Sequence, residues 1–324
     1  MRTIEQYIKD VNLAISNIDY PANPPRLYDP IKYTMADGGK RIRPLLTLMC
    51  NNALGGTGDT AMAQAIGIEM FHNFTLLHDD VMDNSDTRRG KPTVHIKWDQ
   101  NVAILSGDVM LTMATKLISD SKDKHIRAIL ELFNQTAIEI YEGQQFDVDF
   151  EERNDVRVEE YLNMIRLKTS VLIGCACKLG AIVADSNAED ASNLYEFGMN
   201  LGVAFQLQDD YLDVYGDEGF GKPIGGDILN NKKTYMLITA LANAQGDKLE
   251  ELNQWIANNN AVDAKAKIKG VTELYNQLNV PTACEQQIAE YSALALKALD
   301  KVNISDDYRT LFNELVQMLM HRSK

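Results

Sequence analysis

Residues 99–119, DQNVAILSGDVMLTMATKLIS, place apolar side chains at intervals of three and four residues. Val102, Leu105 and Val109 follow this spacing, which puts them on one face of an α-helix. No proline, the strongest helix breaker, occurs in residues 93–222, and runs that alternate polar and apolar residues as strands do are scarce. The stretch therefore predicts an all-α chain.

The same spacing continues on both sides of this stretch and predicts long helices joined by loops. Their expected ranges are 3–18, 27–36, 43–54, 59–83, 99–119, 123–152, 157–184, 188–214, 232–259, 262–278, 282–302 and 306–321. No linker or low-complexity segment separates them. We therefore expect a single domain over residues 1–324.

The composition is acidic, with 46 Asp and Glu against 32 Lys and Arg and a formal net charge of −14. Binding to nucleic acid requires a basic face, so this charge argues against a nucleic-acid partner. The N-terminus has no apolar signal-peptide core, and the apolar residues 170–184 are too few to cross a bilayer. We expect a cytoplasmic protein without a transmembrane segment.

Two acidic clusters have the same spacing: residues 76–83 read LLHDDVMD and residues 205–213 read FQLQDDYLD. In each cluster the first and third aspartates are four residues apart, as Asp79 and Asp83 are, so a helix stacks them on one face. Such like charges destabilise a bare helix, which favours a bound cation. Carboxylates suit magnesium, which also takes phosphate oxygens and water.

One such cluster also fits a solvated helix end. An EF-hand is a poor fit, because no glycine stands at loop position six after Asp79. Two clusters of one spacing, each behind an apolar helix, favour paired magnesium sites that face a common cavity.

Basic residues accompany the clusters. In residues 37–44, DGGKRIRP, a glycine turn opens a helix beside Lys40 and Arg43, which is typical of an anion site. Arg88 and Arg89 follow the first cluster. These residues predict a diphosphate ligand.

Two further features extend this prediction. His72 lies seven residues before Asp79, on the same helical face, where a core histidine and a diphosphate contact are the two interpretations. Glycines crowd residues 216–226 around Lys222, which predicts either a plain connector or a mobile lid over the diphosphate.

This combination resembles the trans-isoprenyl diphosphate synthases, the polyprenyl synthetase family that includes farnesyl and geranylgeranyl diphosphate synthases. The resemblance runs from Gly38 through Tyr235 and rests on both Asp-Asp-x-x-Asp motifs, on GGKRIRP and on Arg88-Arg89-Gly90. It implies an isoprenoid-synthase-type bundle of long antiparallel helices around a deep central cavity, usually as a homodimer.

The resemblance also implies roles for individual residues. Three magnesium ions are expected on Asp79, Asp83 and Asp209, supported by Asp80, Asp210 and Asp213. The residues expected to hold the allylic diphosphate are Arg88, Lys168, Lys222 and Lys232. Those expected to hold isopentenyl diphosphate are Lys40, Arg43, His72 and Arg89. Those expected near the reacting carbons are Thr169, Gln206 and Gln144.

The implied reaction condenses isopentenyl diphosphate with an allylic diphosphate (dimethylallyl, geranyl or farnesyl) by ionisation, condensation and elimination. Product length is expected to depend on Phe74 and Phe71, which would plug the cavity, and on Thr75, which leaves one side open. We expect an all-trans product of C15 to C20, with C20 favoured. Core packing is the alternative role of Phe74.

Two other functions share part of the pattern. A class I terpene cyclase has the first acidic motif, but it normally carries an Asn/Ser/Glu metal motif in place of the second. A non-catalytic regulatory subunit of a heteromeric prenyl synthase should lack acidic ligands, and none is missing from these motifs.

Overall fold

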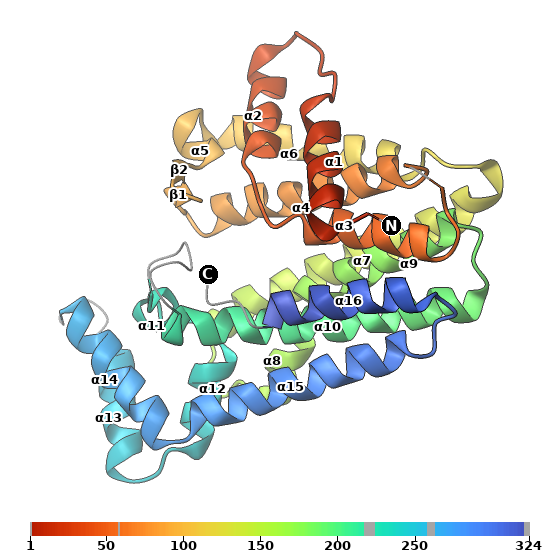
Figure 1. The fold of residues 1–324 in the computed structure, drawn as a ribbon. Helices are drawn as coiled ribbons and strands as arrows, with labels where there is room; N and C mark the ends of the chain where they lie inside the picture. Colours follow the sequence, from red (N-terminus) through yellow and green to blue (C-terminus); the bar gives the residue numbers. More distant parts are fainter. Residues whose placement is uncertain (1, 58, 217–223, 258–262, 321–324) are drawn as a thin grey trace. The chain divides into compact units, whose positions relative to one another are not determined.

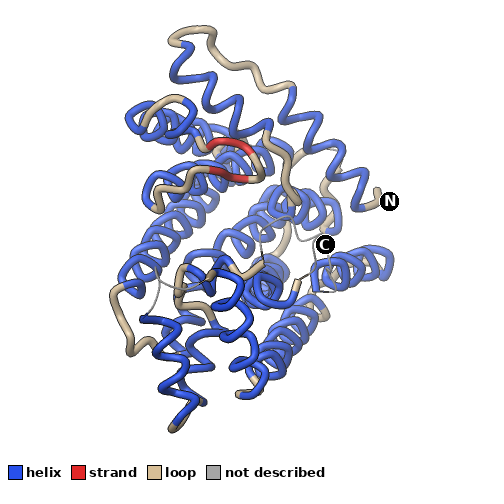
Figure 2. Tube along the Cα trace, turned by 90° about the vertical axis from the view of Figure 1, so that its left-hand side faces the viewer, coloured by secondary structure: helices blue, strands red, loops and turns tan. Residues whose placement is uncertain are grey.

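The computed structural model describes residues 2–57, 59–216, 224–257 and 263–320. These residues are helical almost throughout (Figures 1 and 2), so the all-α prediction is confirmed. The helices before the two short strands are α1 (Ile4–Ser16), α2 (Pro25–Ala36), α3 (Ile42–Ala53) and α4 (Met62–Met82). Strands β1 (Thr87–Arg88) and β2 (Lys91–Pro92) pair antiparallel, and Figure 2 shows them in red.

The remaining elements are again helices. They are α5 (Val94–Lys97), α6 (Gln100–Ile118), α7 (Asp123–Glu151), α8 (Val158–Ile165), the π-helix η1 (Arg166–Ser170), α9 (Val171–Val183), α10 (Ala188–Tyr215), α11 (Gly226–Leu229), α12 (Tyr235–Asn243), α13 (Asp247–Ala257), α14 (Ala264–Gln277), α15 (Val280–Leu299) and α16 (Asp306–Met320).

Two expectations about helix boundaries were wrong, and four short elements were missed. The helix predicted over residues 157–184 contains the π-helical turn η1. The helix predicted over 232–259 is split into α12 and α13, because the chain turns at Gly246 in the left-handed region, with φ +54°. The short elements β1, β2, α5 and α11 were not predicted, because two to four residues carry no periodicity.

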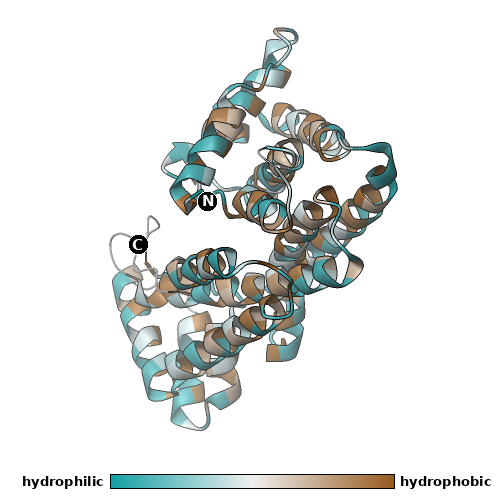
Figure 3. Ribbon diagram, turned by 45° about the vertical axis from the view of Figure 1, so that its right-hand side comes forward, coloured by the Kyte–Doolittle hydropathy of each residue, from teal (hydrophilic) through white to brown (hydrophobic). Residues whose placement is uncertain are grey.

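The chain divides into two compact units. The first unit comprises Met1–Gln135, Leu172–Tyr195 and Asp300–Phe312. The second unit comprises Thr136–Val171, Glu196–Leu299 and Asn313–Lys324. Brown apolar and teal polar residues alternate along the helices in Figure 3, as expected for helices that bury one face.

In the first unit, α4 packs along α6 and against α3. Ile68 and Phe71 of α4 are fully buried. At Gly67 the helices approach so closely that a Cβ atom would lie 2.7 Å from the Ile118 side chain. The core of this unit therefore holds α4, which carries the first acidic cluster at its C-terminal end.

The second unit has its own apolar core. Leu207 of α10, Leu237 of α12, Leu274 of α14 and Cys284 of α15 are buried in one cluster. Because α10 contributes to this cluster, the core orients the helix that carries the second acidic cluster.

Helix α6 is long and apolar enough by length and composition to cross a membrane, with a mean hydropathy of 1.3. Residues 170–184, the apolar segment that the sequence showed to be too short to cross a bilayer, are not part of this helix. One such helix is weak support for a membrane span, because core helices of soluble proteins pass the same test and α6 packs against α2 and α4.

Candidate functional site

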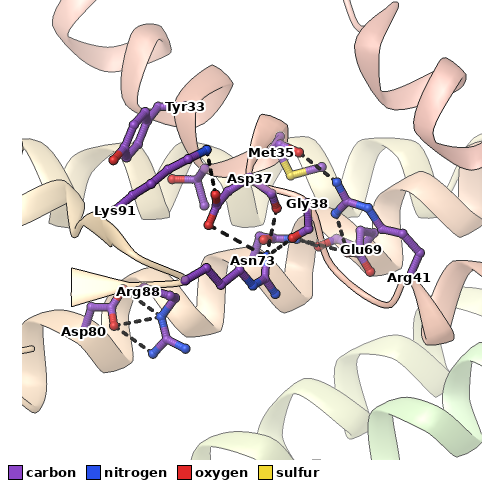
Figure 4. Close-up of polar contacts among 12 residues, drawn as sticks. Tyr33, Met35, Asp37, Gly38, Arg41, Glu69, Asn73, Asp80, Arg88 and Lys91 are labelled. Atoms are coloured by element: carbon purple, nitrogen blue, oxygen red, sulfur yellow. Dashed lines mark hydrogen bonds and ion pairs between the residues drawn. The ribbon is translucent and has the colours of Figure 1, made fainter. Parts of the chain in front are cut away.

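The glycine turn before α3 is anchored by a buried ion pair, shown in Figure 4. Arg41 has a left-handed backbone, with φ 50°, and precedes the first residue of α3. Its Nη1 donates to Glu69 Oε1 of α4 at 2.6 Å, and both side chains are buried. Its Nη2 donates to the Met35 carbonyl at 3.0 Å, and its Nε donates to Asn12 Oδ1 at 3.1 Å. Arg41 thus joins three helices at the start of a fourth.

The predicted anion ligands flank this anchor. Lys40 is exposed and Arg43 is half-buried. Arg89 lies near the same turn, where its Nη1 donates to the Asp37 carbonyl at 2.8 Å and also to the Gly38 carbonyl. The turn that carries Lys40 is therefore held by Arg41 from one side and by Arg89 from the hairpin.

Positive charge gathers around His72. Burial lowers the pKa of His72 well below its usual value, and Arg43, Arg89, Arg88 and Arg41 lower it further. The imidazole is therefore neutral near pH 7. Arginines that repel a proton from one point also attract an anion to it, so this part of the first unit suits a diphosphate.

The first acidic cluster divides into an accessible pair and a buried residue. Asp79 is half-buried, and Asp83 is exposed at the end of α4, where its N–H donates to the Asp79 carbonyl at 2.8 Å. Asp80 is buried, and Arg88 Nε donates to its two carboxylate oxygens at 2.8 and 3.0 Å (Figure 4). Burial raises the pKa of Asp80, and the bonds from Arg88 oppose that rise.

This division fits a hard cation. Asp79 and Asp83 lie one helical turn apart and keep part of their surface in solvent, whereas Asp80 is buried against Arg88. Magnesium uses one or two carboxylates and completes its shell with phosphate oxygens and water. Within the described residues no group of three or more His, Cys, Asp or Glu side chains is arranged to hold a metal, so phosphate would have to supply part of the shell.

A small open hollow on the surface adjoins these residues in the first unit. Its walls come from α2, α4 and the hairpin, and include Asn73, Asp80, Arg88, Arg89 and Lys91. The full lining has three cations and two acids, Asp37 and Asp80, so its formal charge is weakly positive and favours an anionic ligand.

The predicted product-length residues lie in an aromatic cluster. Phe71 and Phe74 are buried, with ring centroids 5.5 Å apart. Phe71 also meets Phe133 edge to face at 5.0 Å, and Phe74 meets His78 at 4.7 Å. Thr75 is half-buried and donates its hydroxyl to a backbone carbonyl one turn earlier. Both phenylalanines therefore pack in the first unit, and a role in product length stays a prediction.

In the second unit, Lys168 and Thr169 lie in the π-helical turn η1, which the N–H of Val171 closes by donating to the carbonyl of Arg166. A Cβ at Gly143 of α7 would lie 2.4 Å from the Lys168 nitrogen. Such turns occur often at functional sites, because they redirect side chains within a helix.

Asp147 pairs with two predicted diphosphate ligands. Its Oδ2 lies 2.6 Å from Lys168 Nζ and 4.0 Å from Lys232 Nζ. Burial raises the pKa of Asp147, but the charges of Lys232 and Lys168 outweigh that effect and the pKa is lowered. An ionised Asp147 thus holds both ammonium groups at one place.

A chain of hydrogen bonds links Thr169 and Gln206, which are expected near the reacting carbons, to the second acidic cluster. Thr169 Oγ1 donates to Gln206 Oε1 at 3.1 Å, and Gln206 Nε2 donates to Asp210 Oδ1 at 3.1 Å. Tyr161 donates its hydroxyl to the other Asp210 oxygen. Burial raises the pKa of Asp210 to about 7.

The other aspartates of this cluster differ in exposure. Asp209 is half-buried, whereas Asp213 is buried and its Oδ1 accepts from the N–H of Asp227 at 3.0 Å. Gln144 is half-buried, and its side-chain oxygen has no hydrogen-bond partner among the described residues. Lys222 and the centre of the predicted lid lie outside the described residues.

The structure thus brings the predicted residues together in two groups, one in each unit. The first unit holds Lys40, Arg43, His72, Asp79, Asp80, Asp83, Arg88 and Arg89. The second unit holds Gln144, Lys168, Thr169, Gln206, Asp209, Asp210, Asp213 and Lys232.

Sequence reasoning missed Glu69, Asp147 and Tyr161. A signal was available for two of them: Glu69 lies three residues before His72 and Asp147 three after Gln144, a spacing that shares a helical face. Tyr161 carries no such signal.

Known proteins share this fold and much of this sequence. The polyprenyl synthetase family model matches residues 24–275. The chain is 36% identical over 306 residues to a geranylgeranyl diphosphate synthase of Saccharolobus solfataricus, covering 93% of this chain and 91% of that one. It is 41% identical over 237 residues to a geranylfarnesyl diphosphate synthase of Aeropyrum pernix, covering 71% and 74%. A crystal structure of a geranylgeranyl pyrophosphate synthase superposes with a TM-score of 0.95 at 42% identity, covering 100% of both chains. The chain therefore belongs to the polyprenyl synthetase family.

Proposed function

We propose that this chain is a magnesium-dependent trans-prenyltransferase, which condenses isopentenyl diphosphate with an allylic diphosphate to give a short-chain prenyl diphosphate. The observation that carries the proposal is the contact of Arg89 with the turn that carries Lys40, in the unit whose helix α4 ends in Asp79 and Asp83. Within a family of prenyl diphosphate synthases, such a site suits a diphosphate better than any uncharged substrate.

In the first unit, Lys40, Arg43, His72 and Arg89 would bind isopentenyl diphosphate. The neutral imidazole can donate one hydrogen bond to a phosphate oxygen without a charge of its own. Arg89, which already holds the turn at Asp37, would bind through its remaining N–H groups.

In the second unit, Lys168 and Lys232 would bind the allylic diphosphate. Both ammonium groups are gathered by Asp147, and the incoming phosphate oxygens would share them with that carboxylate. Thr169, Gln206 and the unpartnered oxygen of Gln144 would direct dipoles at the allylic cation as it forms.

Asp79, Asp83 and Asp209 would hold magnesium, with Asp80, Asp210 and Asp213 in support. Bound magnesium would supply charge that stabilises the departing pyrophosphate. The protein's part is to hold the carboxylates still. The bidentate bond from Arg88 fixes Asp80, and the Tyr161 hydroxyl fixes Asp210.

The proposal requires both acidic clusters to act on one diphosphate within one catalytic domain, and this stays a prediction. A magnesium titration tests it, because one shared site predicts that Asp79→Asn and Asp209→Asn each weaken magnesium activation and that the double variant loses little more than the worse single. Independent effects of the two substitutions would contradict it.

We propose a C20 product, the length that the name of the Saccharolobus relative describes. The Aeropyrum relative is named for a longer product, so longer chains are an outcome to be looked for. No observation favours a terpene cyclase or a regulatory subunit.

We also propose a homodimer that forms through α6. Leu105 is 57% exposed and Ile104 is 39% exposed on this helix, and a second copy would cover them. Leu105→Asp should then give a monomer in size-exclusion chromatography with light scattering, and an unchanged dimer would contradict the assignment. A cytoplasmic location stays a prediction, which cell fractionation tests.

The activity is tested with purified protein, isopentenyl diphosphate and each of the dimethylallyl, geranyl and farnesyl diphosphates, with magnesium or with a chelator. We expect pyrophosphate release and a C20 product with magnesium, and neither with the chelator. A cyclic hydrocarbon, or activity only after a partner protein is added, would contradict the proposal.

A further inference from the structure

Helix α14 buries a lysine on its apolar stripe. Lys267 is 3% exposed, and Val271 and Leu274, four and seven residues later, are buried on the same face. Its neighbours Lys265 and Lys269 are exposed. Burying an ammonium group costs free energy unless hydrogen-bond acceptors replace the water that it loses.

Those acceptors lie at the end of α11 and in the turn that follows it. Lys267 Nζ lies 2.7 Å from Asn231 Oδ1 and 3.3 Å from the carbonyl of Leu229, the last residue of α11. The lysine therefore donates to the last carbonyl of α11, where a cation is favourable, and also to the side chain of Asn231 in the turn that follows.

Asn231 is held at both ends of its side chain. Its Nδ2 donates to the carbonyl of Ile256 at 3.0 Å, while its Oδ1 accepts from Lys267. Its backbone is left-handed, with φ 51°, a conformation that asparagine tolerates better than most residues. Asn231 is followed directly by Lys232, so the direction of the chain into Lys232 is set here.

The other end of this segment meets the second acidic cluster. The N–H of Gly225 donates to the carbonyl of Asp213 at 2.6 Å. A Cβ at Gly225 would lie 2.7 Å from the side chain of Ile268, the residue after Lys267. Residues 225–231 therefore contact Asp213 at their first residue, and they contact α14 at both ends, through Ile268 and Lys267.

From these contacts we propose that Lys267 is a positioning residue for Lys232. By fixing Asn231 and the end of α11, it sets where the Lys232 ammonium stands, 4.0 Å from Asp147. This inference rests on the proposed function, since Lys232 is proposed to bind the allylic diphosphate. It assigns a role to a helix that carries none of the motifs.

The test compares Lys267→Met with Lys265→Met and Lys269→Met, which remove a lysine from the same helix at exposed positions. For Lys267→Met we expect the KM for the allylic diphosphate to rise about tenfold, the effect of losing one well-placed charged hydrogen bond. The KM for isopentenyl diphosphate should stay within about twofold, and both control variants should match the wild type in each constant.

Asn231→Gly provides a second variant, because glycine accepts the left-handed backbone and loses only the side-chain contacts. It should raise the same KM, and the double variant with Lys267→Met should raise it no further. Equal KM values for wild type and both single variants, or equal rises for both substrates, would overturn the inference while the proposed function stands. An inactive wild-type enzyme would overturn the proposed function and this inference with it.

Discussion

The buried pair of Arg41 and Glu69 allows a strong test of what holds the first unit together. Both side chains are buried, and their closest atoms are 2.6 Å apart. Removing one partner leaves the other charged, buried and unpaired. Replacing both by apolar residues of similar size removes the cost of burying two charges together with the attraction between them.

The magnitudes follow from this burial. Arg41→Met should lower the free energy of unfolding by about 3–5 kcal/mol, and Glu69→Leu by about the same amount, because each strands a buried charge. Arg41→Met also releases the Met35 carbonyl and the side chain of Asn12. The double variant should lose less than either single variant, because it strands no charge.

The assay is equilibrium unfolding in urea, which is uncharged and does not screen the ion pair. All variants are compared at one protein concentration, because a dimer would make the apparent stability depend on it. Arg26→Met serves as the control. Arg26 pairs with Asp99 at the surface, with side-chain exposures of 68% and 46%, so its loss should cost about 1 kcal/mol or less.

The reasoning would be refuted by a double variant that loses the sum of the two single losses. Additivity would mean that the two residues act independently and that no buried charge is stranded in either single variant. An Arg41→Met variant as stable as Arg26→Met would refute the burial argument in the same way.

Three further predictions concern product length, the π-helical turn and acid stability. Phe74→Ala should lengthen the product by removing a ring from α4, and an unchanged product chromatogram would exclude Phe74 from length control. Gly143→Ala should lower kcat and raise the KM for the allylic diphosphate, since its Cβ would lie 2.4 Å from the Lys168 nitrogen. Gly180→Ala is the control, because a Cβ there would lie 2.2 Å from a backbone oxygen of the first unit. It should destabilise the chain but leave that KM unchanged. Hydrogen bonds from two lysines lower the pKa of Asp185 to about 2. Its contribution to stability is therefore complete above the unfolded pKa of about 4 and is lost as the pH falls through 2. Asp185→Asn should make the free energy of unfolding depend less on pH in that window, and an unchanged pH dependence would contradict this.

Local sequence was sufficient for most of the helices. Amphipathic spacing predicted α4, α6, α7 and α10 to within a few residues, because apolar periodicity is a property of neighbouring residues. The π-helical turn η1 was not predictable in this way. It packs against Gly143 of α7, a residue that is distant in sequence and that only folding brings near.

Motif spacing likewise identified the acidic and basic residues, together with the family. Spacing separated Asp80 from Asp79 and Asp83, which share a helical face, but it did not show that Asp80 is buried against Arg88, because that contact depends on packing.

The sequence by itself therefore determined which residue types stand at which helical positions, since that information is local. Tertiary structure decided their partners. Arg41 meets Glu69 across 28 residues, and Lys267 meets Asn231 across 36. Hydrogen bonds and ion pairs act over a few ångströms of space, whatever the distance along the chain, so these pairings exist only once the helices have packed.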